Sequence, residues 1–118
     1  MKLLPALFAF SLCAASSRAQ VVITEFMADN TRTVADEDGG FNDWIELHNP
    51  TAAAVNLDGW ALTDDALVPQ KWLFPAGVTV PSRGYLLVWA SNKNKRVAGQ
   101  PLHTNFRLSN SGEYLALV

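Results

Sequence analysis

The feature that most constrains the fold of this chain is a series of short apolar runs that recur about every ten residues, separated by turn-forming residues. Gly, Pro, Asn, Asp and Ser fill the intervening segments and supply the backbone angles and local hydrogen bonds that turns need. No stretch keeps a helical period. The spacing predicts an all-β fold, an antiparallel sandwich or barrel. The expected strands are 21–27, 43–49, 54–57 continuing into 59–63, 71–74, 78–80, 84–90, 103–108 and 113–118.

Alternation within these runs predicts which faces differ in polarity. In 43–49, Trp44 and Glu46 fall on one face, and Ile45 and Leu47 on the other. In 102–108, the even-numbered residues form a dry face and the odd-numbered residues, which include His103, form a solvated face. The run 84–90 is apolar on both faces, which predicts a central strand.

The first 19 residues have the layout of a secretory signal peptide. Lys2 is a short positive region, an apolar run extends from Leu3 to Ala15, and Ser17-Arg18-Ala19 ends the segment with a small-x-small triplet, which predicts cleavage after Ala19. The apolar run has about 13 residues, whereas a spanning helix needs roughly 20. Because no second such run follows, we expect no transmembrane segment after cleavage, and a protein that is secreted or held in the cell envelope.

Cleavage would leave a single small domain, residues 20–118. It removes two of the nine basic residues and none of the eleven acidic ones, so the mature chain carries a formal charge of minus four. It also removes the one cysteine, so the exported domain would depend on its apolar core rather than on disulfides. Four tryptophans, Trp44, Trp60, Trp72 and Trp89, offer large buried areas to that core.

The acidic segment 36–43 is a candidate calcium loop, with Asp36, Asp38 and Asp43 as possible oxygen ligands. The helix-loop-helix calcium pattern fails, because counting from Asp36 places Phe41 where Gly is needed and Leu47 where Glu is needed. The favoured interpretation is a solvated turn in which two glycines reverse the chain. A calcium site outside that motif stays open as an alternative.

No motif indicates catalysis or a bound cofactor. The carboxylates of Glu25, Glu46, Asp64 and Asp65 have no spacing that places two of them across a cleft. The serines lack a Gly-x-Ser-x-Gly elbow, and no glycine-rich loop precedes a helix. The two histidines, His48 and His103, have no further metal ligands at short spacing and are most simply strand residues. We therefore predict no catalytic residues and no cofactor.

Two surface chemistries remain as candidates for binding. Lys93, Lys95 and Arg96 could contact phosphates, but three charges on an acidic domain give little affinity, so nucleic acid is not an expected partner. Flat aromatic rings could stack on sugars, which makes a glycan-binding module an alternative. Against it, tryptophans within alternating strands are more often core residues.

The order of the motifs resembles that of lamin tail domains found in exported bacterial proteins. The resemblance rests on "ITEFMADN", "DEDGGFNDWIELHNP", "AVNLDGWALTDD", "KWLFPAGVTVPSRGYLLVWAS" and "LHTNFRLSNSGEYLALV", from about Val21 to Val118. It implies an immunoglobulin-like antiparallel β-sandwich in which 36–43 is a loop, Ile45 and Leu47 are core residues, and Trp60 and the 85–90 strand are structural. The family is not known for catalysis, so it supplies no catalytic residue.

The resemblance also implies a function for the chain. Members serve as interaction or accessory modules and are often attached to other exported domains, including hydrolases and spore-coat kinase-like domains. They usually continue past a segment like "GEYLALV" into another turn and strand, so we expect 20–118 to be incomplete at its C-terminal end and to be the N-terminal part of a longer secreted protein. The leading hypothesis is an exported interaction or tethering module for an unknown protein or cell-surface ligand. A glycan-binding module and a calcium-dependent accessory domain of a hydrolase are the alternatives.

Overall fold

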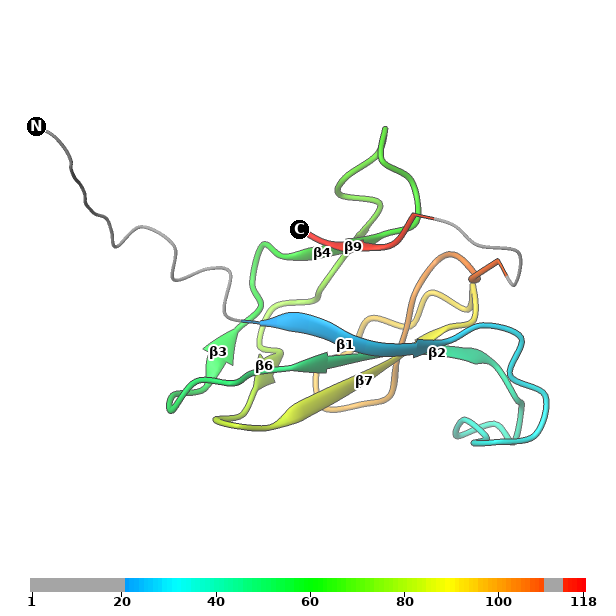
Figure 1. The fold of residues 1–118 in the computed structure, drawn as a ribbon, viewed down its shortest axis with the longest axis horizontal. Coiled ribbons are helices and arrows are strands. Elements are labelled where there is room, and N and C mark those ends of the chain that lie inside the picture. Colours follow the sequence, from blue (N-terminus) through cyan, green and yellow to red (C-terminus); the bar gives the residue numbers. More distant parts are fainter. Residues whose placement is uncertain (1–20, 110–113) are drawn as a thin grey trace, which may run out of the picture.

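A computed structural model describes residues 21–109 and 114–118, and the strands in these residues make an all-β sandwich (Figure 1). The strands are β1 (Val22–Met27), β2 (Asp43–His48), β3 (Val55–Asn56), β4 (Ala61–Thr63), β5 (Trp72–Leu73), β6 (Thr79–Val80), β7 (Tyr85–Ala90), β8 (Leu102–His103) and β9 (Ala116–Leu117). The described residues contain no helix, and so none that is long and apolar enough to cross a membrane. The predicted signal peptide, 1–19, lies outside them.

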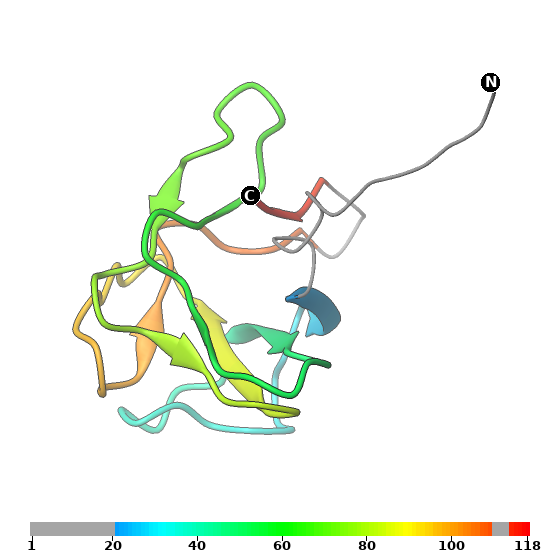
Figure 2. The ribbon, with the colours of Figure 1, turned by 90° about the vertical axis from the view of Figure 1, so that its left-hand side faces the viewer.

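Three sheets build the sandwich. The largest has the order β1-β2-β7-β8, a second has the order β5-β4-β9, and β3 pairs with β6. All pairs are antiparallel except β7 with β8, which is parallel. In Figure 1 the β4–β9 pair lies above β1 and β2, and Figure 2 shows the loop between β4 and β5 projecting from the body. The predicted central strand is confirmed, because β7 lies between β2 and β8.

A single core fills the space between the sheets. Ile45 and Leu47 of β2 are fully buried, as the resemblance implied, and they pair directly with Val88 and Leu86 of β7. Leu62 of β4 belongs to the same cluster from the other side of the sandwich. The fold prediction is therefore confirmed, and both layers depend on one another for burial of apolar surface.

The expected strand at 103–108 is mostly wrong. β8 ends at His103, and the Thr104 hydroxyl donates to the carbonyl of Phe106 at 2.8 Å, a local turn that takes the backbone out of the ladder. The even-numbered residues of 102–108 are buried as expected. However, His103 is also fully buried, although the alternation assigned it to a solvated face. The cause is a loop that covers this face of the sheet.

Candidate functional site

The outer face of the β1-β2-β7-β8 sheet is covered at one end and bare at the other. Directly paired residues share a face, so Trp44, Trp89 and His103 form a row across β2, β7 and β8. This row points away from the core cluster, to which none of the three belongs, yet each of them is buried. The next two rows, Glu46 with Leu87 and His48 with Tyr85, are partly or well exposed.

The loop between β1 and β2 provides the cover. Its fold is fixed by Asn30, which is buried and whose Nδ2 donates to the carbonyls of Val34 at 2.8 Å and Asn42 at 2.9 Å. Further along, the N–H of Gly39 donates to the carbonyl of Asp36 in a turn where Gly39 has a φ of 82°, a left-handed angle that glycine adopts at little cost. The predicted chain reversal at the two glycines is thus confirmed.

Asp36 is not a solvated turn residue, because its side chain is fully buried and all its bonding capacity is used. Oδ1 accepts the N–H groups of Asp38 at 3.0 Å and Gly40 at 2.9 Å. Oδ2 accepts Asn42 Nδ2 at 2.5 Å and Lys93 Nζ at 2.7 Å. Burial opposes ionisation of this carboxyl, but the hydrogen bonds, led by that of Lys93, outweigh it and lower the pKa of Asp36 to about 2.

Two lysines from the turn after β7 form ion pairs with the other two acidic residues of the loop, Glu37 and Asp38. Lys93 Nζ also lies 2.8 Å from Asp38 Oδ2, and Lys95 Nζ lies 2.8 Å from Glu37 Oε2 and 2.9 Å from Asp38 Oδ2. The hydrogen bond from Lys95 lowers the pKa of Glu37, and the hydrogen bond to Asp36 raises the pKa of Lys93. We call these five residues together with His103 and Ser91 the loop clasp.

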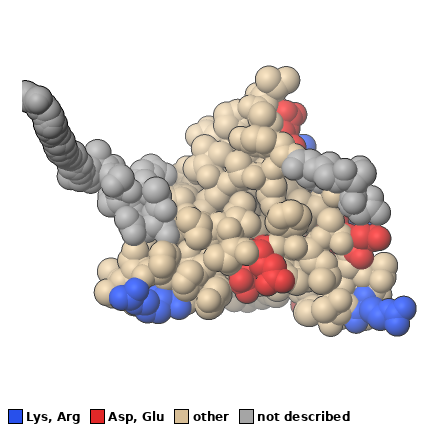
Figure 3. Space-filling model, in the orientation of Figure 1, with Lys and Arg blue, Asp and Glu red and all other residues tan. Residues whose placement is uncertain are grey.

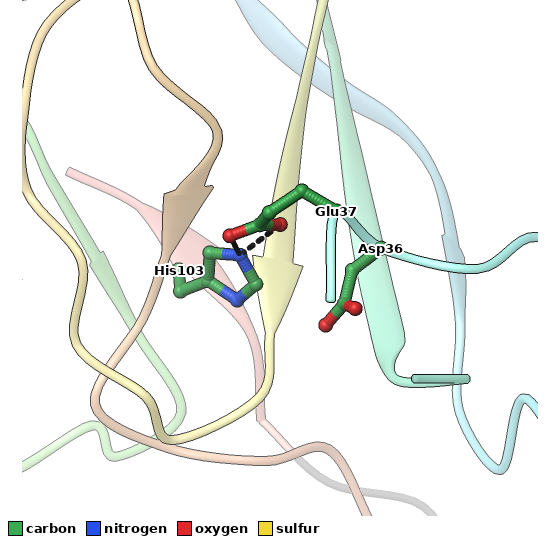
Figure 4. A group of neighbouring side chains, drawn as sticks. All are labelled: Asp36, Glu37 and His103. Carbon is green, nitrogen blue, oxygen red and sulfur yellow. Dashed lines mark hydrogen bonds and ion pairs between the residues drawn. The ribbon is translucent and has the colours of Figure 1, made fainter. Parts of the chain in front are cut away.

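Glu37 and Ser91 bond to the two ring nitrogens of the buried His103. His103 Nε2 lies 2.8 and 3.0 Å from the carboxylate oxygens of Glu37, and Figure 4 shows Glu37 reaching over the ring. On the other side, Ser91 Oγ lies 2.7 Å from His103 Nδ1. With the Glu37 carboxylate as acceptor, Nε2 carries the proton and Nδ1 accepts the Ser91 hydroxyl. The clasp therefore fixes one tautomer of His103.

Ser91, His103 and Glu37 are the residue types of a nucleophilic catalytic triad, but a substrate cannot reach the serine hydroxyl. Ser91 is buried, and its Oγ accepts the N–H of Lys93 at 3.1 Å, so that oxygen is engaged on two sides. His103 is fully enclosed. A substrate carbonyl must come within bonding distance of the nucleophile, and these contacts leave no room for it. These three residues are better explained as a structural network that holds the loop on the sheet.

The same cluster contains three groups of the kinds that ligate metals. One ligand atom each from Asp36, Glu37 and His103 lie within 4.8 Å of one another. However, the ammonium groups of Lys93 and Lys95 already bond to both carboxylates. A cation would have to displace those ammonium groups, and the clasp is close to neutral without it. Sequence spacing missed this cluster because Glu37 and His103 are 66 residues apart.

The three calcium candidates from the sequence do not converge. Asp36 and Asp38 share the ammonium group of one lysine. Asp43 lies elsewhere, because its two carboxylate oxygens accept the backbone N–H groups of Asn30 and Leu108, each at 3.2 Å. Asp43 therefore anchors the ends of two loops to β2, and the structure brings only Asp36 and Asp38 together.

The four carboxylates considered for glycoside hydrolysis fall in two places, one pair on the β1–β2 ladder and one pair in the β4–β5 loop. Glu25 and Glu46 are cross-strand partners on β1 and β2. Asp64 forms an ion pair with Lys71 at 2.7 Å, and Asp65 Oδ1 accepts the N–H of Leu67 at 2.9 Å in the β4–β5 loop. The Glu25–Glu46 juxtaposition could not be read from the sequence, because it depends on the register of two strands and on a bulge between Ile23 and Glu25.

The aromatic and basic residues considered as binding groups are mostly buried or bonded to other residues in the structure. All four tryptophans are at most 8% exposed, so none presents a ring to solvent. Trp60 and Trp72 belong to the core cluster, as expected, whereas Trp44 and Trp89 are buried on the outer face of the large sheet. Tyr85 and Tyr114, at 58% and 49%, are among the exposed aromatics instead. In the basic run, Lys93 and Lys95 pair with the acidic loop, and Arg96 Nε donates to the carbonyl of Leu73 at 2.8 Å.

Comparison with known proteins gives one match. The family model of the Lamin Tail Domain matches residues 14–118, which is most of the chain and begins before the predicted cleavage site. No curated protein matches the chain, and no solved structure does. The family match agrees with the two-layered all-β arrangement of the described strands.

Proposed function

Because the chain belongs to the Lamin Tail Domain family, we propose that it is a non-catalytic, exported module that binds or tethers another molecule as an accessory domain of a secreted protein. Export is supported by the signal-peptide pattern of the first 19 residues. A binding role is supported by the family and by the scaffold, a sandwich that exposes part of one sheet face.

The loop clasp is the observation that carries the proposal of a non-catalytic role. Its carboxylates, lysines and histidine bond to one another across the β1–β2 loop and the turn after β7. Asp36, Ser91 and His103 are buried, and the more exposed members of the clasp bond to one another, so these groups stabilise a surface rather than act on a substrate. The covered end of the sheet therefore has a structural role, and the bare end is the surface available for binding.

The test is to follow the secreted protein in the organism that makes it. Its intact mass identifies the cleavage site, with a chain that starts at Gln20 as the expected result, and a longer mature protein would identify the domain to which this one is accessory. Fractionation then measures how much of the protein stays with the cell surface. Release of all of it, or hydrolase activity that disappears when Glu37 is changed to Gln, would contradict the proposal.

Calcium dependence is a weaker alternative, because Asp36 and Asp38 already bond to Lys93. Calorimetry with calcium is its direct test. Heat of binding together with a higher melting temperature, both abolished by Asp36→Asn, would establish a calcium-dependent accessory domain. We expect neither effect.

A further inference from the structure

The bare end of the outer sheet face contains an ordered aromatic platform. Two neighbouring rows cross it: Val22, His48 and Tyr85 in one, and Glu46 with Leu87 in the other. Three of these side chains are apolar and exposed: Val22 is 42% exposed, Tyr85 58% and Leu87 38%. We call these five residues the Tyr85 platform.

The ring of Tyr85 is held in place before any ligand arrives. It stacks on the imidazole of His48 with ring centroids 4.3 Å apart and an interplanar angle of 24°. His48 is itself fixed, because its Nδ1 lies 3.0 Å from the carbonyl oxygen of Gly84. The backbone of Tyr85 is also held by its pairing with His48 in the β2–β7 ladder. An aromatic group braced in this way loses little conformational entropy when it binds.

A hydrogen-bond acceptor, the carboxylate of Glu46, lies in the row next to that of Tyr85. Glu46 is two residues before His48 on the same face of β2, and its Oε1 accepts the hydroxyl of Thr24 at 2.8 Å. Neither Glu46 nor its cross-strand partner Glu25 forms an ion pair with a lysine or arginine in the described part of the chain. Figure 3 shows a group of acidic side chains in the lower middle of the view, with basic side chains toward its two ends. The platform thus combines a flat apolar ring with carboxylate oxygens.

The size of the platform argues against a protein partner as its ligand. Three strands and two rows of side chains cover about 10 Å by about 7 Å, given the spacing of strands and of alternate residues. A stable protein–protein interface covers about 800 Å² on each partner, which is roughly ten times more. One or two sugar rings fit this area. A pyranose also has the matching chemistry, with C–H groups on its faces and hydroxyl groups on its rim.

We propose that the Tyr85 platform binds a saccharide, with one pyranose ring stacked on the Tyr85 side chain and hydroxyl groups donating to the carboxylate of Glu46. This inference rests on the proposed binding role and names its ligand class. The other exposed tyrosine, Tyr114, lies just before β9 and provides a matched control, because it is similarly exposed on a different sheet.

The experiment titrates the secreted protein with cellohexaose, xylohexaose and chitohexaose while the Tyr85 ring resonances are followed by NMR. We expect saturable shifts of the Tyr85 ring with at least one of them. Tyr85→Ala should weaken binding about tenfold or more, while Tyr85→Phe, which keeps the ring, and Tyr114→Ala should leave it unchanged. An unchanged melting temperature of Tyr85→Ala shows that the variant is folded.

Two results would overturn the inference: no Tyr85 shift with any of the three sugars, or the same loss of affinity in Tyr85→Ala and Tyr114→Ala. The fraction of protein retained at the cell surface shows whether only the saccharide inference fails or the proposed binding function fails as well. If the wild-type protein is retained but binds no sugar, the tethering role stands without a saccharide ligand. If Tyr85→Ala also loses that retention, the platform binds a different class of molecule. If even the wild-type protein is released, the proposed function itself fails.

Discussion

At the end of β2, a fully buried asparagine connects three segments of the chain through its side chain. Asn49 Nδ2 donates to the carbonyls of Ala53 at 2.8 Å, Val80 at 3.1 Å and Pro81 at 3.2 Å, while Oδ1 accepts from the N–H and the hydroxyl of Thr51. The bonds from Thr51 to Asn49 Oδ1 close a local turn directly after the strand. The contacts to Val80 and Pro81 depend on residues more than 30 positions away, so no local pattern predicts them.

Replacement of Asn49 by Ala should lower the free energy of unfolding by about 2–4 kcal/mol, because it removes a buried side chain that donates to one buried and two partly buried carbonyl groups. Chemical denaturation of the variant and the wild-type protein measures the difference. Asn56→Ala is the control, since Asn56 is exposed and its side chain accepts the N–H of Asp58, and it should cost less than about 1 kcal/mol. Equal losses in the two variants would contradict the role given to Asn49.

Among the elements, the strands were predicted far better than the contacts of the loops. The alternation of 43–48 depends on neighbours in sequence and on one buried face, so it indicated both the strand and its two faces. The loop 36–40 was correctly placed as a turn, but the burial of Asp36 was not predicted. Its partner Lys93 lies 57 residues away, and His103 was assigned to solvent because nothing local signals the loop that covers it.

The loop clasp makes stability depend on acid pH. The pKa of Asp36 falls from an ordinary value of 3.8 to about 2 in the folded protein. A carboxyl with a lowered pKa stabilises the fold fully above its unfolded value, and that contribution disappears as the pH falls through the folded value. We therefore expect a loss of stability between about pH 4 and pH 2, measured by denaturation at several pH values.

Asp36→Asn should flatten this acid dependence and lower stability at pH 7, because Lys93 loses its buried partner. Asp64→Asn is the matched control, since Asp64 pairs with Lys71 in the β4–β5 loop, away from the clasp. A steep acid dependence that persists unchanged in Asp36→Asn would show that other carboxyls cause it.

For the whole molecule, one core shared by the two main sheets explains why the small β5-β4-β9 sheet can exist with such short strands. Strands of two or three residues have few hydrogen bonds of their own and need apolar burial to persist. The family resemblance and the strand pattern predicted this architecture. The parallel pairing of β8 with β7 was not predicted, because no sequence pattern specifies which edge a two-residue strand will join.

Leu62→Ala in β4 should therefore destabilise the entire sandwich by about 2–5 kcal/mol rather than only the small sheet. Tryptophan emission and far-ultraviolet circular dichroism should report the same shifted transition. Leu67→Ala is the control, because Leu67 is 90% exposed on the β4–β5 loop and should change stability by less than about 0.5 kcal/mol. Separate transitions in the two signals would show that the sheets unfold independently.

The two halves of the clasp, the β1–β2 loop and the turn after β7, lie far apart in the sequence. This distance affects the order in which contacts form during folding. The lysine–carboxylate pairs join residues 55 to 58 positions apart, so they can form only after β2 and β7 have paired and brought the two loops together. Contacts made after the transition state slow unfolding without speeding folding. The ion pairs of the clasp therefore lower the unfolding rate of the native sandwich and have little effect on its folding rate.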